Sequence, residues 1–302
     1  MTCIGLGKII LLGEHAVVYG FPALAAALDR GVTMAAVPTP AGGSLRLDIP
    51  AWSLKILASD DHPVSRALLA ITDSLGVGRP TVTLVGDAQI PHSAGLGSSA
   101  ALAVAVSRAM LSHAKRKLDA KEIAAAASAS EALMHGRASG VDVALAQAGG
   151  IGVYRKATGL RSFASAPLRV LVGPSGAPRT TSAMVDKVAD ATSASPDDKR
   201  LRALGALTDT GTNALLAKDL AGLGASMNKA HEILAGLGVS TDQLDSLCDA
   251  ARSTGAHGAK LTGAGGGGAV IAIAPREREN AILTEWKNAG VTGFVATVGG
   301  GA

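Results

Sequence analysis

The apolar positions along the chain follow two periodicities, and these predict the order of its elements. Short apolar or alternating runs predict strands at residues 4–12, 32–37, 44–49, 81–85, 151–154, 168–174, 269–274 and 292–298. Helical spacing predicts helices at residues 62–75, 99–111, 119–134, 139–147, 200–217, 219–236, 240–252 and 276–289. Residues 16–28 are small and apolar and receive no element, and the polar residues 191–199 predict a loop. The composition changes near residue 165, which predicts domains at 1–164 and 165–302.

A loop of small residues connects the predicted strand at 81–85 to the helix at 99–111. It consists of Pro91, His92, Ser93, Ala94, Gly95, Leu96, Gly97, Ser98, Ser99, Ala100 and Ala101. The start of a helix presents backbone N–H groups and the positive end of the helix dipole, which suit a phosphate. Gly95 and Gly97 allow close approach of an anion, and Ser98 and Ser99 are expected N-cap residues whose hydroxyls also suit phosphate or Mg²⁺. A plain flexible loop that ends in an N-cap serine is the alternative.

The same glycines satisfy a loose dinucleotide-binding fingerprint, Gly95-x-Gly97-x-x-Ala100, with Asp119 roughly 20 residues further on. However, residues 87–94 separate the glycines from the preceding strand. The segment around Asp119 also has a helical pattern where the fingerprint requires a strand. The context therefore favours a phosphate-binding helix N-terminus over a nicotinamide site.

A second glycine-rich segment follows Lys260 and contains Gly263, Ala264 and Gly265 within the pattern Gly263-x-Gly265-x-x-Gly268. An apolar strand follows it, so the dinucleotide interpretation fails here as well. A strand–loop–strand of this kind suits the covering of a phosphate group, and a simple hairpin turn is the alternative. Four consecutive glycines lose much conformational freedom on folding, which is a high cost for a plain turn.

Five ionisable residues are candidates for chemistry. Lys8 lies in an apolar strand pattern, either facing outward or directed at a transferring phosphoryl group. Glu14 and His15 follow a glycine in a turn, which is either solvated or in contact with a polar ligand. Glu131 lies near the end of its helix, where the dipole disfavours a carboxylate; a bound cation or solvent exposure would explain it. Asp142 forms a possible capping box with Ser139, and it also suits a general base at a helix N-terminus.

Composition narrows the class of protein. The formal net charge is +4, but two Trp, two Tyr and three Phe offer little for stacking bases, so we expect no nucleic-acid partner. No apolar run approaches the roughly 18 residues of a membrane span, and we expect no membrane partner. Cys3 and Cys248 fit a reducing compartment and have no metal-ligand spacing, so we expect them to be packing residues in a cytoplasmic protein.

Three separated motifs together resemble a known family. Residues 8–20, 91–101 and 260–268 resemble, in order, the three signature motifs of the GHMP kinases. Within that superfamily the chain resembles the mevalonate kinases, in the run Gly-Glu-His-Ala-Val-Val-Tyr-Gly at 13–20 and in the segment 131–142. The resemblance implies an α+β fold of two domains with the active site in the cleft between them, and a homodimer. It also implies transfer of phosphate from ATP, with Mg²⁺, to the 5-hydroxyl of mevalonate. One departure is His92-Ser93, where many members have a pair that ends in glycine.

The resemblance also implies a role for each candidate. Asp142 corresponds to the catalytic base, and Lys8 to the lysine that stabilises the attacking oxygen and the γ-phosphoryl group. Ser99 and Glu131 correspond to the Mg²⁺ ligands, and residues 91–101 to the cradle of the triphosphate. Gly263, Ala264 and Gly265 lie in the loop that closes the site. Glu14, His15, Ser139, Thr181 and Ala264 correspond to positions near the substrate.

Three alternatives remain open. The first is another kinase of the superfamily, acting on phosphomevalonate or a sugar. The second is a non-catalytic sensor that binds nucleotide and substrate, against which the joint presence of Lys8, Ser99, Glu131 and Asp142 argues. The third is a nicotinamide oxidoreductase, which the context of the first glycine loop disfavours.

Overall fold

The computed structural model describes residues 2–39, 43–135, 140–177 and 181–299. The chain divides into two compact units. Unit 1 comprises Met1–Gly7, Arg30–His92 and Gly97–Ala148, and unit 2 comprises Lys8–Asp29, Ser93–Leu96 and Gly149–Ala302. Two long strands, β1 (Cys3–Leu12) and β2 (Ala23–Pro38), contribute residues to both units.

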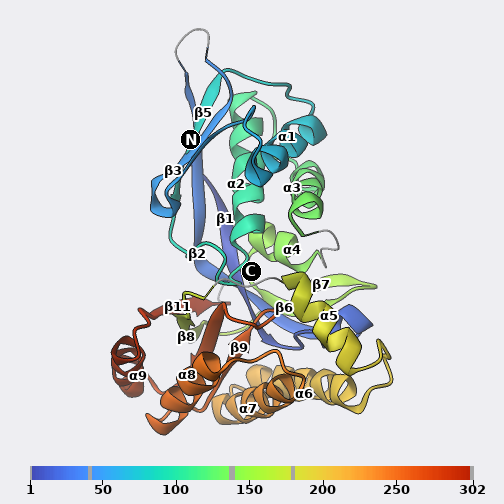
Figure 1. Cartoon of the computed structure of the whole chain (residues 1–302), viewed down its shortest axis with the longest axis vertical. Coiled ribbons are helices and arrows are strands. Elements are labelled where there is room, and N and C mark those ends of the chain that lie inside the picture. The colour runs from blue at the N-terminus through green and yellow to red at the C-terminus, as the bar shows by residue number, and fades with distance from the viewer. Residues whose placement is uncertain (1, 40–42, 136–139, 178–180, 300–302) are drawn as a thin grey trace. The chain divides into compact units, whose positions relative to one another are not determined.

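Unit 1 combines a sheet with four helices. Besides parts of β1 and β2 its elements are β3 (Arg46–Ile49), β4 (Leu54–Leu57), β5 (Val82–Ala88), α1 (Pro63–Leu75), α2 (Ser98–His113), α3 (Ala120–His135), α4 (Val141–Ala148) and the 3₁₀ turn η2 (Pro50–Trp52). The strand order is β4-β3-β5-β2; β3 and β5 are parallel and the other neighbours are antiparallel. Figure 1 shows the four helices gathered on one side of these strands.

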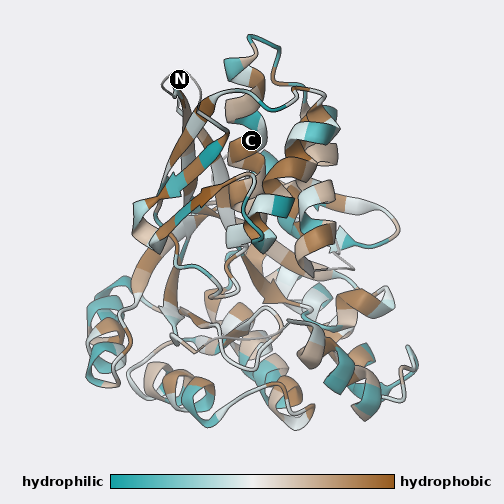
Figure 2. Cartoon of the chain, turned by 45° about the horizontal axis from the view of Figure 1, so that its top comes forward, coloured by the Kyte–Doolittle hydropathy of each residue, from teal (hydrophilic) through white to brown (hydrophobic). Residues whose placement is uncertain are grey.

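Helix α2 is the centre of unit 1. It packs against α1, α3 and α4, and it is buried around most of its circumference. Alanine occupies many of its buried positions, and small side chains let neighbouring helices approach closely. By contrast, α1 is amphipathic: Val64, Leu68, Ile71 and Leu75 are buried at helical spacing. Figure 2 shows helices that change between apolar brown and polar teal around their circumference.

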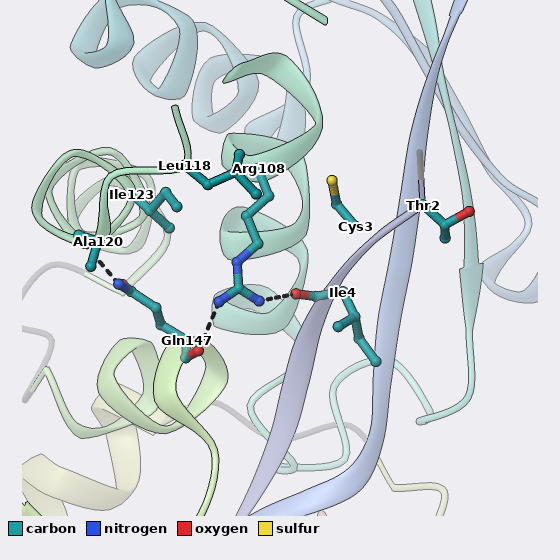
Figure 3. A pocket seen from close by; sticks show the side chains of 8 residues that line it. All are labelled: Thr2, Cys3, Ile4, Arg108, Leu118, Ala120, Ile123 and Gln147. Carbon is teal, nitrogen blue, oxygen red and sulfur yellow. Dashed lines mark hydrogen bonds between the residues drawn. The ribbon is translucent and has the colours of Figure 1, made fainter. Parts of the chain in front are cut away.

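Arg108 of α2 connects three elements of unit 1 (Figure 3). Its guanidinium donates hydrogen bonds to the carbonyl of Ile4 in β1 and, at 2.8 Å, to the carbonyl of Gln147 in α4. Gln147 in turn donates through Nε2 to the carbonyl of Ala120 at 2.8 Å. These residues, together with Thr2, Cys3, Leu118 and Ile123, line a cavity of about 280 Å³ that contains none of the candidate residues named above. The contacts hold α4, and with it Asp142, against α2 and α3.

Unit 2 is built on an antiparallel sheet of order β2-β11-β8-β10-β9, in which β6 also pairs with β2, and β7 pairs with β6. Its elements are β6 (Ile151–Arg155), β7 (Gly159–Ser162), β8 (Leu168–Pro174), β9 (Gly258–Thr262), β10 (Ala269–Ile273), β11 (Phe294–Val298), α5 (Thr181–Ala191), α6 (Lys199–Leu216), α7 (Leu220–Gly236), α8 (Asp242–Ser253), α9 (Arg276–Asn288) and the 3₁₀ turn η1 (Ala16–Tyr19). Helices α7 and α8 pack on β9, and α6 lies beside α7. Every residue of β9 and β10 is buried.

Several elements differ from the sequence prediction. The structure contains α5, β4 and β7, which the pattern did not indicate, and β2 begins at Ala23 although residues 16–28 received no element. The first part of β2 is a buried run of Ala and Leu without alternation, so period-two analysis does not detect it. The strands β4 and β7 have four residues each, which is too short to show a period.

Both cysteines are buried, as expected. Within the described residues, no helix combines the length and apolar character needed to cross a membrane.

Candidate active site

The first glycine loop leads onto an uncapped helix N-terminus. Gly97 is the N-cap of α2 in the left-handed conformation, with φ 72°, and Gly95 has φ 78°. Within the described residues no side chain caps this end, and the Gly97 carbonyl accepts the N–H of Ala101 at 2.9 Å. The prediction that Ser98 or Ser99 is the N-cap is therefore wrong, because both serines lie in the first turn of the helix. A helix start of this kind suits an anion.

Trp52 contacts the earlier part of the loop in two ways. In unit 1 the His92 ring packs edge-on against Trp52, with centroids 5.3 Å apart, and Trp52 Nε1 donates to the carbonyl of Ile90 at 2.9 Å. Burial lowers the pKa of His92 below its ordinary value. Ser93 has φ 60°, in the left-handed region that glycine adopts without strain. Many members of the family that the chain resembles have a glycine at this position. Ser93 adopts the backbone conformation expected of that glycine.

Lys8 is buried in the middle of β1. Its side chain is 4% exposed, so the outward-facing alternative is wrong. Its backbone N–H donates to the carbonyl of Leu96 at 2.8 Å, which joins β1 to the first glycine loop within unit 2. A buried ammonium group is stable only where charges or dipoles compensate it. The bond to Leu96 places Lys8 beside the loop that is predicted to bind phosphate.

The turn after β1 buries two ionisable side chains. Glu14 is 1% exposed and His15 is 5% exposed, so the interpretation as a solvated turn is wrong. His15 has φ 59°, which is costly for a residue with a Cβ and is characteristic of functional sites. Its Nε2–H donates to the carbonyl of Ala264 at 2.9 Å. The structure therefore brings together the first and third predicted motifs in unit 2.

The second glycine segment forms the loop of the β9–β10 hairpin. Gly263, Gly265, Gly266, Gly267 and Gly268 all have positive φ, between 68° and 124°. A Cβ at Gly265 would lie 2.0 Å from the carbonyl oxygen of Val239, so no larger residue fits. The loop also approaches α5, because a Cβ at Gly266 would lie 2.7 Å from the sulfur of Met184. Thr181 is the first residue of that helix and is half-buried.

The remaining candidates lie on helices of unit 1 that pack against one another. Ser99 is in the first turn of α2, Glu131 on α3 and Asp142 in the first turn of α4. Glu131 is 3% exposed, so solvent exposure does not explain its position near the end of α3. Asp142 is half-buried in the first turn of α4. Ser139, the other predicted member of the capping box, lies outside the described residues.

Two site-forming residues escaped the sequence analysis. Lys260 in β9 is fully buried and forms an ion pair with Glu14. Thr262 Oγ1 donates to the carbonyl of Ile10 at 3.0 Å and accepts the N–H of Ile10 at 2.9 Å. The sequence offered a signal for Lys260, which is a lysine inside an otherwise apolar strand. The same signal identified Lys8.

Comparisons with known proteins agree with this geometry. A model of the GHMP kinases N terminal domain matches residues 62–150, and a model of the GHMP kinases C terminal region matches residues 213–292. The chain is 36% identical to a mevalonate kinase of Thermococcus sibiricus, over 94% of this chain and 91% of the relative.

Solved structures agree as well. A crystal structure of L. major mevalonate kinase in complex with R-mevalonate has a TM-score of 0.86 and 28% identity, covering 99% of this chain and 96% of the other. The Methanococcus jannaschii mevalonate kinase has a TM-score of 0.84 and 27% identity, covering 99% of this chain and 98% of the other. The GHMP kinase fold, a mixed α+β architecture, is therefore the fold of this chain. Because the sequence similarity extends over nearly its full length, the chain belongs to the GHMP kinases and, within them, to the mevalonate kinases.

Proposed function

We propose that this protein transfers the γ-phosphoryl group of ATP to the 5-hydroxyl of mevalonate. One observation supports the proposal above the others. Four ionisable residues to which the resemblance gives roles in binding or catalysis, Lys8, Glu14, His15 and Glu131, are at most 5% exposed. Buried charged groups destabilise a fold unless they are compensated, so the burial of these four residues at motif positions indicates function.

Asp142 is the proposed general base. It accepts the proton of the 5-hydroxyl as that oxygen bonds to the γ-phosphorus and the bond between phosphorus and the ADP oxygen breaks. It lies in the first turn of α4. Lys8 is proposed to stabilise the negative charge on the attacking oxygen and on the phosphoryl group.

Residues 91–101 are the proposed cradle for the triphosphate, with the start of α2 as its anion-binding element. Gly263, Ala264 and Gly265 are proposed to cover the nucleotide. Glu14, His15 and Thr181 are proposed substrate contacts, together with Ala264 and with Ser139, which lies outside the described residues. These positions orient the reactants, which is the main contribution of a protein to phosphoryl transfer.

Ser99 and Glu131 are the proposed Mg²⁺ ligands. A hydroxyl and a carboxylate are the hard oxygen donors that Mg²⁺ prefers, and both are carried by helices that pack against each other. The burial of Glu131 also fits a position next to a cation. When bound, Mg²⁺ neutralises charge on the phosphate oxygens.

The resemblance further supports a homodimer, and the composition supports a cytoplasmic protein without a nucleic-acid or membrane partner. It also supports a two-domain organisation with a boundary near residue 165.

The deciding experiment is a coupled ADP-release assay with Mg-ATP and mevalonate, phosphomevalonate or galactose. We expect turnover with mevalonate alone. Turnover with either of the other compounds would contradict the proposed substrate while leaving a phosphoryl-transfer enzyme. Nucleotide binding by calorimetry without turnover of any of the three would instead indicate a sensor.

A further inference from the structure

Glu14, a proposed substrate contact, forms a buried ion pair in unit 2 with a lysine that has no part in the mechanism above. Lys260 lies in the middle of β9 and is fully buried, and Glu14 is 1% exposed. The Lys260 ammonium donates to Oε1 of Glu14 and to the carbonyl of its neighbour Leu261. Taking two charges out of water is costly, and a pair of this kind is often less stabilising than apolar side chains of similar volume. Its presence in the core therefore calls for a reason other than stability.

The pair lies among contacts that join two distant segments of the chain. Ile10 of β1 exchanges hydrogen bonds of 2.9 and 3.0 Å with Thr262, and His15 donates to Ala264 at 2.9 Å. Glu14 and Lys260 make their contact in the same region, across 246 positions of sequence. Three successive contacts thus attach the end of β1 and its turn to β9 and the glycine loop. Lys260 supplies the only charged contact among the three.

The strand that carries Lys260 is itself held from the helix side. The N–H of Leu261 donates to Nδ1 of His231 at 3.3 Å, and Nε2 of His231 donates to Asp245 at 3.0 Å. His231 belongs to α7 and Asp245 to α8, so both helices that cover β9 fix its position. The Lys260 ammonium group is consequently presented to Glu14 from a rigid element.

Glu14 retains an acceptor that the described residues do not satisfy. Its Oε2 atom is buried and has no hydrogen-bond partner among them, whereas Oε1 is held by Lys260. A buried polar atom without a partner is rare and costly, and at a binding site it marks a position for a donor of the ligand. A carboxylate accepts from a hydroxyl group and repels another carboxylate, so the hydroxyl-bearing part of a hydroxy-acid substrate is the matching chemistry.

We propose that Lys260 is a positioning residue that holds the carboxylate of Glu14 so that Oε2 accepts a hydrogen bond from a substrate hydroxyl. This inference rests on the proposed function, which places Glu14 beside the substrate. Lys260 does not touch the reacting atoms in this scheme. It acts through Glu14 and, by joining the turn to the hairpin, through the backbone contact between His15 and Ala264.

The charges around the pair make the proposal sensitive to pH. Burial raises the pKa of Glu14, and the positive charges of Lys260 and Lys8 oppose that rise. Burial lowers the pKa of Lys260, which faces Glu14 and Cys248 and also lies near His231. Removal of the Lys260 charge would therefore raise the pKa of Glu14 further. The ionised, accepting form of Glu14 would then disappear at a higher pH than in the unmodified protein.

The test compares Lys260→Met with the double variant Lys260→Met/Glu14→Gln. For Lys260→Met we expect the KM for mevalonate to rise at least about tenfold, since a charge-assisted hydrogen bond is lost or misplaced. The KM for ATP should change little, and the acid limb of kcat/KM for mevalonate should move to higher pH. The single variant should also melt about 10 °C lower, because it leaves a buried charge without its partner. The double variant removes both charges and should regain most of that loss while its KM for mevalonate stays high.

Lys229→Met is the matched control, because Lys229 is an exposed lysine on α7. It should leave KM, pH profile and melting temperature unchanged. A folded Lys260→Met protein with the KM and acid limb of the unmodified enzyme would overturn the proposal and leave the ion pair a purely structural role.

Hydrogen–deuterium exchange separates this inference from the proposed function, because it needs no turnover. In Lys260→Met we expect faster exchange at residues 13–16 and 263–268 than in the Lys229→Met control. Unchanged exchange in both segments would overturn the positioning role. An unmodified protein that does not phosphorylate mevalonate would contradict the proposed function, while the exchange result still decides whether Lys260 orders the turn and the hairpin.

Discussion

At the scale of single residues, the most informative feature is the presence of ionisable side chains in apolar strands. Lys8 and Lys260 each interrupt an apolar strand, and both are buried. In an ordinary strand a lysine faces solvent, and its burial requires compensating partners. Glu14 provides one such partner for Lys260, and its own burial shows that the turn after β1 belongs to the interior. The charges were visible in the sequence, but their burial was not.

Replacement of Asp142 by Asn tests the proposed base. The amide keeps the size of the side chain but does not accept a proton, so we expect kcat to fall by about 10²–10⁴. The KM values for ATP and mevalonate should change far less, because the contacts in the ground state persist. Steady-state kinetics on the folded variant checks this, and a kcat within a factor of three or so of the unmodified enzyme would remove Asp142 from its role.

Replacement of Glu131 by Gln tests the proposed metal site. Because the amide loses the negative charge that attracts Mg²⁺, half-maximal activity should require at least about tenfold more Mg²⁺. Activity measured across a Mg²⁺ titration at saturating ATP checks the prediction. A Mg²⁺ requirement identical to that of the unmodified protein would indicate that Glu131 is buried for a structural reason.

At the scale of elements, the strand β9 is fixed by the two helices that cover it. His231 accepts the N–H of Leu261 through Nδ1, so its proton is on Nε2, which donates to Asp245. Cys248 lies beside this pair, with Sγ 4.0 Å from Nδ1, but burial raises the pKa of its thiol to about 12. A thiol with that pKa is not a nucleophile at neutral pH, so the three side chains are a structural cluster.

The cluster predicts how stability depends on pH. Burial lowers the pKa of His231 below its unfolded value, so on acidification the unfolded chain takes up a proton more readily than the folded one. The free energy of unfolding should therefore decrease as pH falls from about 7 through the unfolded pKa of about 6.5, by at most about 1.4 kcal/mol per pH unit from this residue. Urea unfolding of the protein and of His231→Asn, whose amide keeps an acceptor but does not titrate, checks this. Equal pH slopes in the two proteins would contradict it.

The contact between α7 and β9 depends on the absence of side chains. A Cβ at Gly224 of α7 would lie 2.4 Å from the carbonyl carbon of His257, and one at Gly258 would lie 2.1 Å from the carbonyl oxygen of Gly224. We expect Gly224→Ala to destabilise the protein by about 1–3 kcal/mol, because backbone has to move. Gly236→Ala at the end of the same helix is the control: nothing lies within 4 Å there, and alanine favours the helix by up to about 1 kcal/mol. Equal unfolding free energies for the two variants would show that α7 and β9 are less closely packed.

At the scale of the whole molecule, packing divides the chain differently from its order in sequence. Because β1 and β2 pass through both units, each unit collects segments from separate parts of the chain. The single change of composition near residue 165 gives no sign that each unit is built from separate segments of the chain. The boundary at residue 165 stays a prediction about the two domains of the family.

The proposed homodimer is also a property of the whole molecule. Light scattering should give a mass of twice the 29.9 kDa of one chain. With a net charge of only +4, repulsion between two copies is weak at ordinary ionic strength. A mass near that of one chain across a range of protein concentrations would contradict the dimer.

The sequence by itself determined the elements with a strong period and the motifs with unusual residue types. Helices such as α1 and α7 and the two glycine loops follow from spacing, capping and backbone freedom, which act between near neighbours. Tertiary structure alone decided three features. Gly97, and not Ser98 or Ser99, is the N-cap of α2. A strand begins at Ala23, and Lys260 forms an ion pair with Glu14. These outcomes depend on contacts between residues far apart in the chain, where burial outweighs local preference. Local patterns therefore identified the candidate residues, and long-range packing determined which side chains contact them.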